Sequence, residues 1–255
     1  MATLTKPGVL AIIQARMNSR RLPGKMMLEL GGGMTPIEWI LKRNRGKCKV
    51  TQWVLATTDH PDDDPLTKLA ETINLPCVRG SESDVLDRFM KSWEAFPHEH
   101  VLRITGDCPF HDPTIINQVI DRHLKDHLDY TSNTHPPHWP DGLDVEVFRS
   151  IPLKEAWAEA KRPSQREHVT PFFYQNPDRF SLGNVQRALD SSHLRITLDE
   201  KEDLDLLRTI AKHFNHHHFG AEEVIEWLMT HSDKRLINQH ISRNEGYQHS
   251  LKEDL

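Results

Sequence analysis

The stretch Val9–Lys25, VLAIIQARMNSRRLPGK, indicates an α/β fold. Its first five residues are all apolar, and a β-strand buried on both faces of a parallel sheet is predicted over Val9–Gln14. The polar residues that follow include Pro23 and Gly24, which predict a loop at the carboxyl end of this strand. Open α/β sheets bind their ligands at this edge, so the loop is expected to line a binding site.

Short apolar runs and helical patterns alternate along about the first 130 residues, as in layered α/β folds. Further strands are predicted over Trp53–Thr57, Cys77–Arg79 and His100–Thr105. The predicted helices of this part are Pro36–Lys47, Asp64–Ile73, Ser83–Phe96 and Pro113–His127. Ser83 is the expected N-cap of its helix, because a serine side chain can accept a hydrogen bond from the first turn.

The pattern changes after residue 130, where the loop HPPHWPDG (135–142) separates two β-rich runs. Strands are predicted over Leu128–Thr134, Leu143–Phe148 and Arg195–Leu198, and helices over Pro152–Lys161, Gln165–Tyr174, Lys201–Phe214 and Ala221–Met229. The tail from about Ile241 onward is polar and is expected to fray. No flexible linker marks a boundary, so the change is interpreted as a strand-rich insertion within one domain.

The composition argues against several classes of protein. The 255 residues include 32 Lys+Arg and 37 Asp+Glu, for a net charge of −5, and no basic tract favours nucleic acid as a partner. No apolar run reaches the roughly 18–20 residues of a membrane span, and no signal-peptide pattern is found, so we expect a cytoplasmic protein. Cys48, Cys77 and Cys108 lack CxxC spacing, which argues against disulfides or a thiolate zinc site.

The loop after the first strand concentrates positive charge within ten residues, at Arg16, Arg20, Arg21 and Lys25. A polyphosphate needs several cations and backbone N–H groups that converge on it, and a loop with Ser19 and Gly24 allows close backbone approach. The alternative is a solvated basic loop without a ligand. The loop matches neither GxxxxGK[ST] nor GxGxxG, which argues against the kinases and dehydrogenases that carry those motifs.

Together with its strand, this loop resembles the N-terminal signature of the CTP-dependent sugar-acid cytidylyltransferases, which include the 3-deoxy-manno-octulosonate and acylneuraminate enzymes. The matching positions are Arg16, Ser19, Arg21, Leu22, Pro23, Gly24 and Lys25. The resemblance continues through RGSESDVLDRF (79–89), RITGDCPFHDP (103–113), PDGLDVEVF (140–148), REHVTPF (166–172) and RITLDEKEDLDLL (195–207). It is greatest for the branch of spore coat polysaccharide biosynthesis protein F.

The resemblance implies a three-layer, Rossmann-like nucleotidyltransferase fold with a mixed, mostly parallel sheet and a strand-rich insertion. It implies one cytidylyltransferase domain over residues 1–255. Within it, residues 8–130 would form the nucleotide-binding half and 131–215 the acceptor and dimer half, followed by a C-terminal helix and tail over 216–255. A homodimer is therefore expected.

The resemblance also implies the residues of a nucleotide site. Arg16, Arg21 and Lys25 would bind phosphates and act in catalysis with Asp107, and Asp107 and Asp199 would hold Mg²⁺. The implied nucleotide-binding residues are Gln14, Ala15, Arg16, Ser19, Arg21, Gly24, Lys25, Thr57, Asp59, Arg79, Gly80, Ser81 and Gly106. Base and ribose would lie beside Arg79–Ser81.

The acidic residues allow plainer interpretations as well. Asp107 and Asp199 each follow an apolar strand, where a carboxylate can hold a hard cation or simply form a turn or cap. Glu202, Asp203 and Asp205 are expected to form a solvated acidic first turn, which suits the helix dipole. The carboxylates at 62–64 are expected to make a turn and an N-cap, and Asp84 and Asp87 could merely pair with Arg88 on a helix surface.

Residues in the second half are candidates for binding the acceptor. Asp141, Arg166, Glu167 and His168 suit the carboxylate and hydroxyls of a sugar acid, as the resemblance implies. The alternative is that Gln165–Tyr174 is a packed amphipathic helix with polar residues outward. The histidines at 216–218 are expected at the exposed end of a helix before Gly220, and not in a zinc site.

The predicted function is transfer of CMP from CTP to an acidic sugar of the nonulosonic or octulosonic type, with release of pyrophosphate, for surface polysaccharide synthesis. Two alternatives remain open. One is a metal-dependent glycosyltransferase of the same fold, although the DxD motifs at Asp62–Asp64 and Asp203–Asp205 are poorly placed for it. The other is a non-catalytic nucleotide-binding protein.

Overall fold

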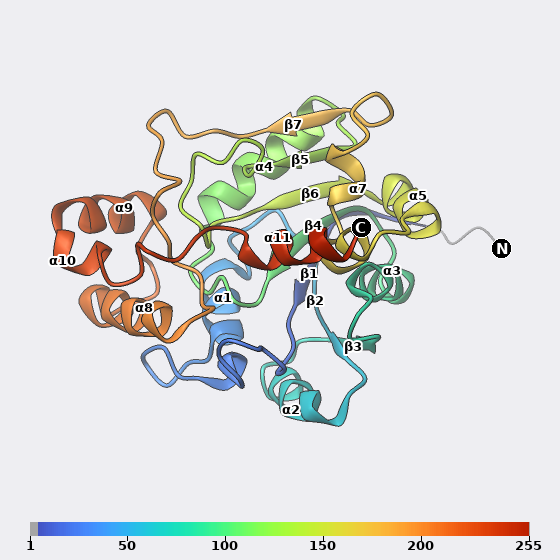
Figure 1. Cartoon of the computed structure of the whole chain (residues 1–255). Coiled ribbons are helices and arrows are strands. Elements are labelled where there is room, and N and C mark those ends of the chain that lie inside the picture. The colour runs from blue at the N-terminus through green and yellow to red at the C-terminus, as the bar shows by residue number, and fades with distance from the viewer. Residues whose placement is uncertain (1–4, 255) are drawn as a thin grey trace.

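A computed structural model describes residues 5–254. Its centre is a seven-stranded sheet with the strand order β3-β2-β1-β4-β6-β5-β7 (Figure 1). The strands are β1 (Lys6–Gln14), β2 (Gln52–Thr58), β3 (Cys77–Gly80), β4 (His98–Thr105), β5 (Tyr130–Ser132), β6 (Glu146–Arg149) and β7 (Leu182–Asn184). Only β6 runs antiparallel to its neighbours, β4 and β5, and the other pairings are parallel. The predicted mixed, mostly parallel sheet is confirmed.

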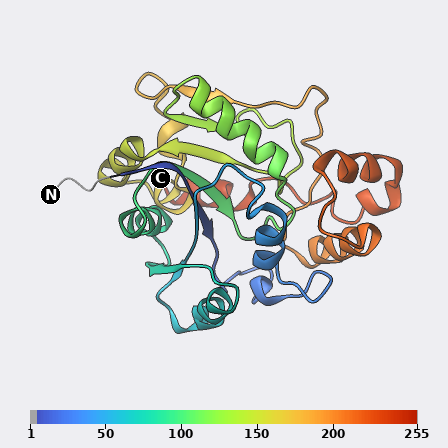
Figure 2. The ribbon, with the colours of Figure 1, turned by 180° about the vertical axis from the view of Figure 1, so that it is seen from behind.

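Helices cover both faces of the sheet (Figures 1 and 2). The helices are α1 (Pro36–Asn44), α2 (Asp64–Thr72), α3 (Val85–Ala95), α4 (Pro113–Lys125), α5 (Ser150–Glu159), α6 (Pro163–His168), α7 (Pro171–Tyr174), α8 (Lys201–Phe214), α9 (Ala221–Thr230), α10 (Ser232–Arg235) and α11 (Glu245–Glu253), with 3-10 turns η1 (Lys25–Met27) and η2 (Pro61–Asp63). None of the helices in residues 5–254 combines the length and apolarity that crossing a membrane requires.

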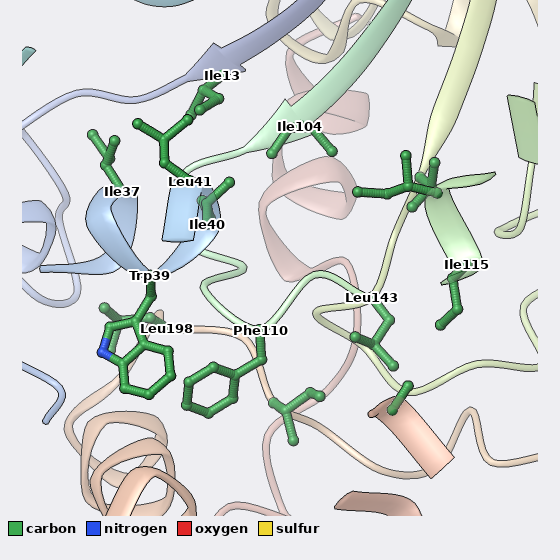
Figure 3. Packing of buried hydrophobic residues seen from close by; sticks show 14 of the residues in the cluster. Ile13, Ile37, Trp39, Ile40, Leu41, Ile104, Phe110, Ile115, Leu143 and Leu198 are labelled. Carbon is green, nitrogen blue, oxygen red and sulfur yellow. The ribbon is translucent and has the colours of Figure 1, made fainter. Parts of the chain in front are cut away.

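The hydrophobic core consists of two clusters separated by the sheet. Successive side chains of β1 point to opposite faces, so Ala11 and Ile13 join one cluster and Leu10 and Ile12 the other. In the first cluster, the rings of Trp39 and Phe110 meet edge to face, with centroids 5.3 Å apart (Figure 3). Burial of each large apolar side chain stabilises the fold by about 1.5–3 kcal/mol, and this core fixes β1 and β4 side by side.

The first half of the chain folds as its pattern predicts, with one correction at a helix start. The N-cap of α3 is Asp84 and not Ser83, because the Asp84 carboxylate accepts a hydrogen bond of 2.8 Å from the backbone N–H of Asp87. Asp84 therefore does not pair with Arg88, and it forms an ion pair with Arg166 instead.

The second half departs further from prediction. The segment 195–198 is not a strand and forms only an isolated bridge between Arg195 and Asp141. The short strand β7 was not predicted. The helix expected over Gln165–Tyr174 is two helices, α6 and α7, because Val169 has a φ of 69° and Pro171 begins a new helix.

The C-terminal region also differs from prediction. Helix α8 ends at Phe214, and Asn215 adopts the left-handed conformation with a φ of 50°. The histidines at 216–218 therefore lie in a loop, and Gly220 is the N-cap of α9 instead of ending α8. The tail expected to fray contains α11, which lies across the front of the sheet in Figure 1.

Candidate functional site

A cavity of about 1060 Å³ opens at the carboxyl ends of β1 and β4. The loop that follows β1 forms one wall, and α11 forms another. Asp107 follows β4 and Asp199 precedes α8, and both carboxylates line the space between these walls. The cavity thus lies at the sheet edge where the sequence predicts a ligand.

The loop after β1 is anchored by Asp63, a buried residue of η2. Its carboxylate accepts hydrogen bonds from the Met17 backbone N–H at 2.7 Å, from the Thr57 hydroxyl at 2.9 Å and from the Thr58 backbone N–H at 2.9 Å. Burial raises the pKa of Asp63, but these bonds outweigh it and hold the pKa below its usual value. Asp63 is the N-cap residue of α2, as expected, but its side chain makes no capping hydrogen bond and instead ties β2 to the loop.

Lys25 joins the two carboxylates that the sequence analysis paired. Its Nζ lies 2.8 Å from Asp107 Oδ2 and 2.9 Å from Asp199 Oδ1. Burial lowers the pKa of Lys25, whose exposed fraction is 8%, but the attraction of both carboxylates raises it above its usual value. Lys25 is therefore an ammonium ion held at the base of the cavity.

Asp199 is surrounded by cations. Besides Lys25, Arg21 Nη2 lies 3.0 Å from its Oδ1, and Arg195 Nη2 lies 3.0 Å from its Oδ2. Burial raises the pKa of Asp199, yet Lys25, Arg21 and Arg195 lower it to about 2. This carboxylate is ionised at any physiological pH.

Arg195 organises the acidic residues behind Asp199. Its guanidinium donates to Asp141 at 2.7 Å and to both carboxylate oxygens of Asp203 at 2.9 Å. Asp203 has no exposed surface and also accepts bonds from the backbone N–H groups of Asp199 and Glu200. The solvated position expected for Asp203 is therefore wrong, since this residue fixes the turn that presents Asp199.

Asp141 reaches the cavity from the segment before β6. Burial first, and then repulsion from Asp144, raises its pKa to about 7, although Arg243 and Arg195 counteract this. Arg243, which precedes α11, forms an ion pair with Asp144. Asp141 is thus a carboxyl group that can exchange a proton near neutral pH.

Asp107 and Asp199 fit a divalent cation, because both already contact one cation, the Lys25 ammonium. Within residues 5–254, the one hydrogen-bond donor to Asp107 Oδ1 is the Cys108 thiol, at 3.8 Å. In residues 5–254 no group of three or more histidine, cysteine or acidic side chains could hold a metal. Mg²⁺ commonly takes one or two carboxylates and completes its shell with phosphates and water, so two carboxylates suffice.

Three of the four expected acceptor residues lie on α6, and two of these, Glu167 and His168, contact α11. The Ser250 hydroxyl donates to Glu167 at 2.6 Å and lies 3.0 Å from His168 Nε2. Burial, followed by the charge of Arg103, lowers the pKa of His168 to about 4, so its imidazole is neutral at pH 7. Arg166 does not line the cavity, because its guanidinium binds Asp84.

The structure brings together most of the residues singled out from the sequence. Those that line the cavity are Gln14, Ala15, Arg16, Ser19, Arg21, Lys25, Asp107, Asp141, Glu167, His168 and Asp199. Those that do not are Gly24, Thr57, Asp59, Arg79, Gly80, Ser81, Gly106 and Arg166.

Several of the residues outside the lining support the cavity walls. Arg79 donates to the Thr58 and His60 carbonyls and thereby braces the turn after β2. At Gly106 a Cβ would lie 2.9 Å from Ala15 Cβ and 3.0 Å from the Gln14 carbonyl oxygen. Only glycine allows this approach of β4 to the loop.

Sequence reasoning missed a buried ion pair at the far end of the cavity. Arg103 of β4 pairs with Glu146 of β6, and Tyr130 donates to the same carboxylate at 2.5 Å. A charged residue inside the apolar strand HVLRIT was the available signal. The cavity-lining residues of α11 gave no signal, because this segment has no apolar run.

Comparisons with known proteins give concordant matches. A family model described as Cytidylyltransferase matches residues 10–230. Protein MJ1063 of Methanocaldococcus jannaschii is 33% identical over 241 residues, which is 94% of this chain and 97% of that protein. The spore coat polysaccharide biosynthesis protein SpsF of Bacillus subtilis is 31% identical over 208 residues, which is 79% of this chain and 85% of that protein.

Solved structures share the fold. A cytidylyltransferase from Leptospira borgpetersenii has a TM-score of 0.83 and 27% identity, over 94% of this chain and 99% of its own. CMP:2-keto-3-deoxy-manno-octonic acid synthetase, complexed with CTP, has a TM-score of 0.64 and 14% identity, over 81% of this chain and 99% of its own. Rv0371c from Mycobacterium tuberculosis, in complex with manganese, has a TM-score of 0.55 and 11% identity, over 79% of this chain and 98% of its own.

Proposed function

Because the chain belongs to the cytidylyltransferase family, we propose that it transfers CMP from CTP to an acidic sugar and releases pyrophosphate. The observation that carries the proposal is the convergence of Lys25, Asp107 and Asp199 at the base of the cavity. The wall above them contributes further positive charge, from Arg16, Arg20 and Arg21. Cations and carboxylates together suit a phosphate-bearing substrate and a divalent ion. The name of the SpsF relative supports a role in surface polysaccharide synthesis.

In this proposal the loop after β1 binds the triphosphate. Arg21 now contacts Asp199, Glu200 and Glu245, the last at 3.0 Å. A triphosphate offers more negative charge than any of these side chains, so Arg21 would exchange its carboxylates for phosphate oxygens. Lys25 and Arg16 would take the remaining charge of the leaving pyrophosphate.

Asp107 and Asp199 would hold a divalent ion, which we propose is Mg²⁺. When bound there, the ion would offset phosphate charge and lower the pKa of the attacking hydroxyl. Arg195 and Asp203 keep the Asp199 carboxylate oriented toward the cavity. Asp141, which lines the cavity and has a pKa of about 7, would accept the proton of the acceptor hydroxyl.

The acceptor would occupy the end of the cavity between α6 and α11, where Glu167 and His168 provide hydrogen-bonding groups. The family resemblance supports a homodimer, one domain over residues 1–255 and a cytoplasmic location, with no nucleic acid or membrane partner.

Pyrophosphate release tests the proposed function. The purified protein is incubated with Mg²⁺, each of the four nucleoside triphosphates and a panel of nonulosonic and octulosonic acids. Release that requires both CTP and one acid supports the proposal. Release of a free nucleotide from a nucleotide sugar would instead indicate a glycosyltransferase, and CTP binding without turnover across the panel would indicate a binding protein.

A further inference from the structure

Arg88 of α3 is a buried cation beside the cavity. It is 2% exposed, yet it belongs to the cavity lining. Its Nη1 donates to the carbonyl oxygens of Ser81 at 2.7 Å and Glu82 at 3.2 Å. Its Nε is buried and has no hydrogen-bond partner among residues 5–254. The guanidinium therefore retains donor capacity that the described protein does not use.

The positive charge of Arg88 also has no ion-pair partner among the described residues. The sequence suggested Asp84 or Asp87 as its partner, but Asp84 pairs with Arg166 and Asp87 pairs with Lys91. No carboxylate in the described part of the chain forms an ion pair with Arg88. Burial, and then repulsion by Arg16, lowers its pKa to about 10, so it remains charged at pH 7. A buried charge without a counter-ion is costly unless a ligand compensates it.

Arg43 shows what a purely structural buried arginine looks like in this fold. Burial likewise lowers its pKa to about 10, but its guanidinium donates to the carbonyl oxygens of Phe110, His111, His217 and Phe219. It also lies over the Phe219 ring, 4.1 Å from the centroid, and it does not line the cavity. All three guanidinium nitrogens of Arg43 donate hydrogen bonds to the protein, whereas the Nε of Arg88 has no partner among residues 5–254.

We propose that Arg88 binds a phosphate group of the nucleotide, together with Arg16. Arg16 Nη1 lies 3.5 Å from the Glu82 carbonyl oxygen, so both arginines flank the turn at 81–83. Arg16 already forms an ion pair with Glu167 at 3.6 Å. An anionic oxygen between the two arginines would provide Arg88 with the ion-pair partner that it lacks among residues 5–254. The inference rests on the proposed function, because it assigns a residue to that same site.

Binding measurements on matched variants test this assignment. Arg88→Lys and Arg88→Met are compared with Arg43→Lys and wild type by calorimetry with CTP and pyrophosphate, and by NMR titration with millimolar cytidine. Loss of one charge-assisted contact should raise the dissociation constants for CTP and pyrophosphate about 10- to 100-fold in the Arg88 variants. Cytidine, which has no phosphate, should bind as it does to wild type. Arg43→Lys should lower the melting temperature and leave nucleotide affinity unchanged.

Two results would overturn the assignment. Unchanged CTP affinity in Arg88→Lys would do so, and this variant serves if Arg88→Met fails to fold. Equal weakening of cytidine and CTP would do so as well, because Arg88 would then only support the turn at 81–83. Wild type could instead bind another triphosphate more tightly than CTP. If Arg88→Lys then weakens the binding of that triphosphate, the assignment of Arg88 holds while the CTP proposal fails. If wild type binds neither a triphosphate nor pyrophosphate, both proposals fail.

Discussion

In residues 5–254, Asp107 keeps its Oδ1 oxygen free of strong partners, whereas both oxygens of Asp199 are occupied by cations. We expect Asp107→Asn to lower turnover at least about 100-fold, because charge stabilisation at the reacting phosphate is the largest contribution in such sites. The amide oxygen can still accept from Lys25, so the melting temperature should change little. Steady-state kinetics and thermal melts check this, with exposed Asp62→Asn as the control; a wild-type rate would remove Asp107 from the proposed machinery.

Asp199 should make the fold sensitive to acid. Its folded pKa of about 2 lies below the usual 3.8, so the carboxylate stabilises the fold above about pH 4, and this stabilisation disappears as the pH falls toward 2. By linkage the loss is about 2 kcal/mol. Urea unfolding at several pH values should show the free-energy gap between wild type and Asp199→Asn shrinking over this range. A gap that stays constant with pH would contradict the assigned pKa.

At the scale of elements, the buried pair of Arg103 and Glu146 joins β4 to the antiparallel strand β6. Glu146→Gln would leave the Arg103 charge uncompensated, so we expect the free energy of unfolding to fall by about 3–5 kcal/mol. The exposed pair of Lys49 and Asp121 is the matched control, and Asp121→Asn should cost less than about 1 kcal/mol. Urea titrations measure the free energy of unfolding of both variants. An equal loss of this free energy in both would contradict the expectation that the buried pair matters more than the exposed one.

Polar contacts hold α11 against α6, through Ser250 near its middle and through Asp254, which accepts two hydrogen bonds from Ser164, at its end. Ser250→Ala should therefore raise the rate of amide hydrogen exchange across Glu245–Glu253, because the bonds to Glu167 and His168 are lost together. Exchange in β1 should stay unchanged and serves as the internal control. An unaltered exchange rate in α11 would contradict this prediction, because the other contacts of α11 would then be enough to hold the helix in place.

The elements that the sequence predicts well are those whose burial is visible in their own apolar pattern. Apolar runs such as Val9–Gln14 identify the parallel strands, since both faces are covered. The strand expected over Arg195–Leu198 is wrong because Arg195 serves as a buried donor to Asp141 and Asp203, and no such long-range pairing is visible in a local pattern. The break at Val169 depends on a positive φ that its residue type does not announce.

At the scale of the whole molecule, the two core clusters share one sheet, so we expect them to unfold together. Trp39 belongs to one cluster and Trp93 to the other, and tryptophan fluorescence therefore reports on both faces. Urea unfolding followed by fluorescence and by far-ultraviolet circular dichroism should give coincident transitions. Two separate transitions would contradict the proposal of one domain.

The family itself was predictable because its motifs are short, ordered and placed at the ends of strands. The resemblance seen in IIQARMNSRRLPGK is confirmed by a family match over residues 10–230. Roles that depend on burial were not predictable in this way. Arg88 looked like a helix-surface partner of Asp84 or Asp87, but the structure of residues 5–254 shows it buried at the cavity and without an ion pair.

The position of Lys25 between two carboxylates has a practical consequence. The Lys25 ammonium is a counter-ion to both carboxylates, so its positive charge offsets the repulsion between Asp107 and Asp199 without a metal ion. Extraction of divalent ions with EDTA should therefore leave the melting temperature of the ligand-free protein unchanged. Protein purified in a chelating buffer should be as well folded as protein kept with magnesium salts.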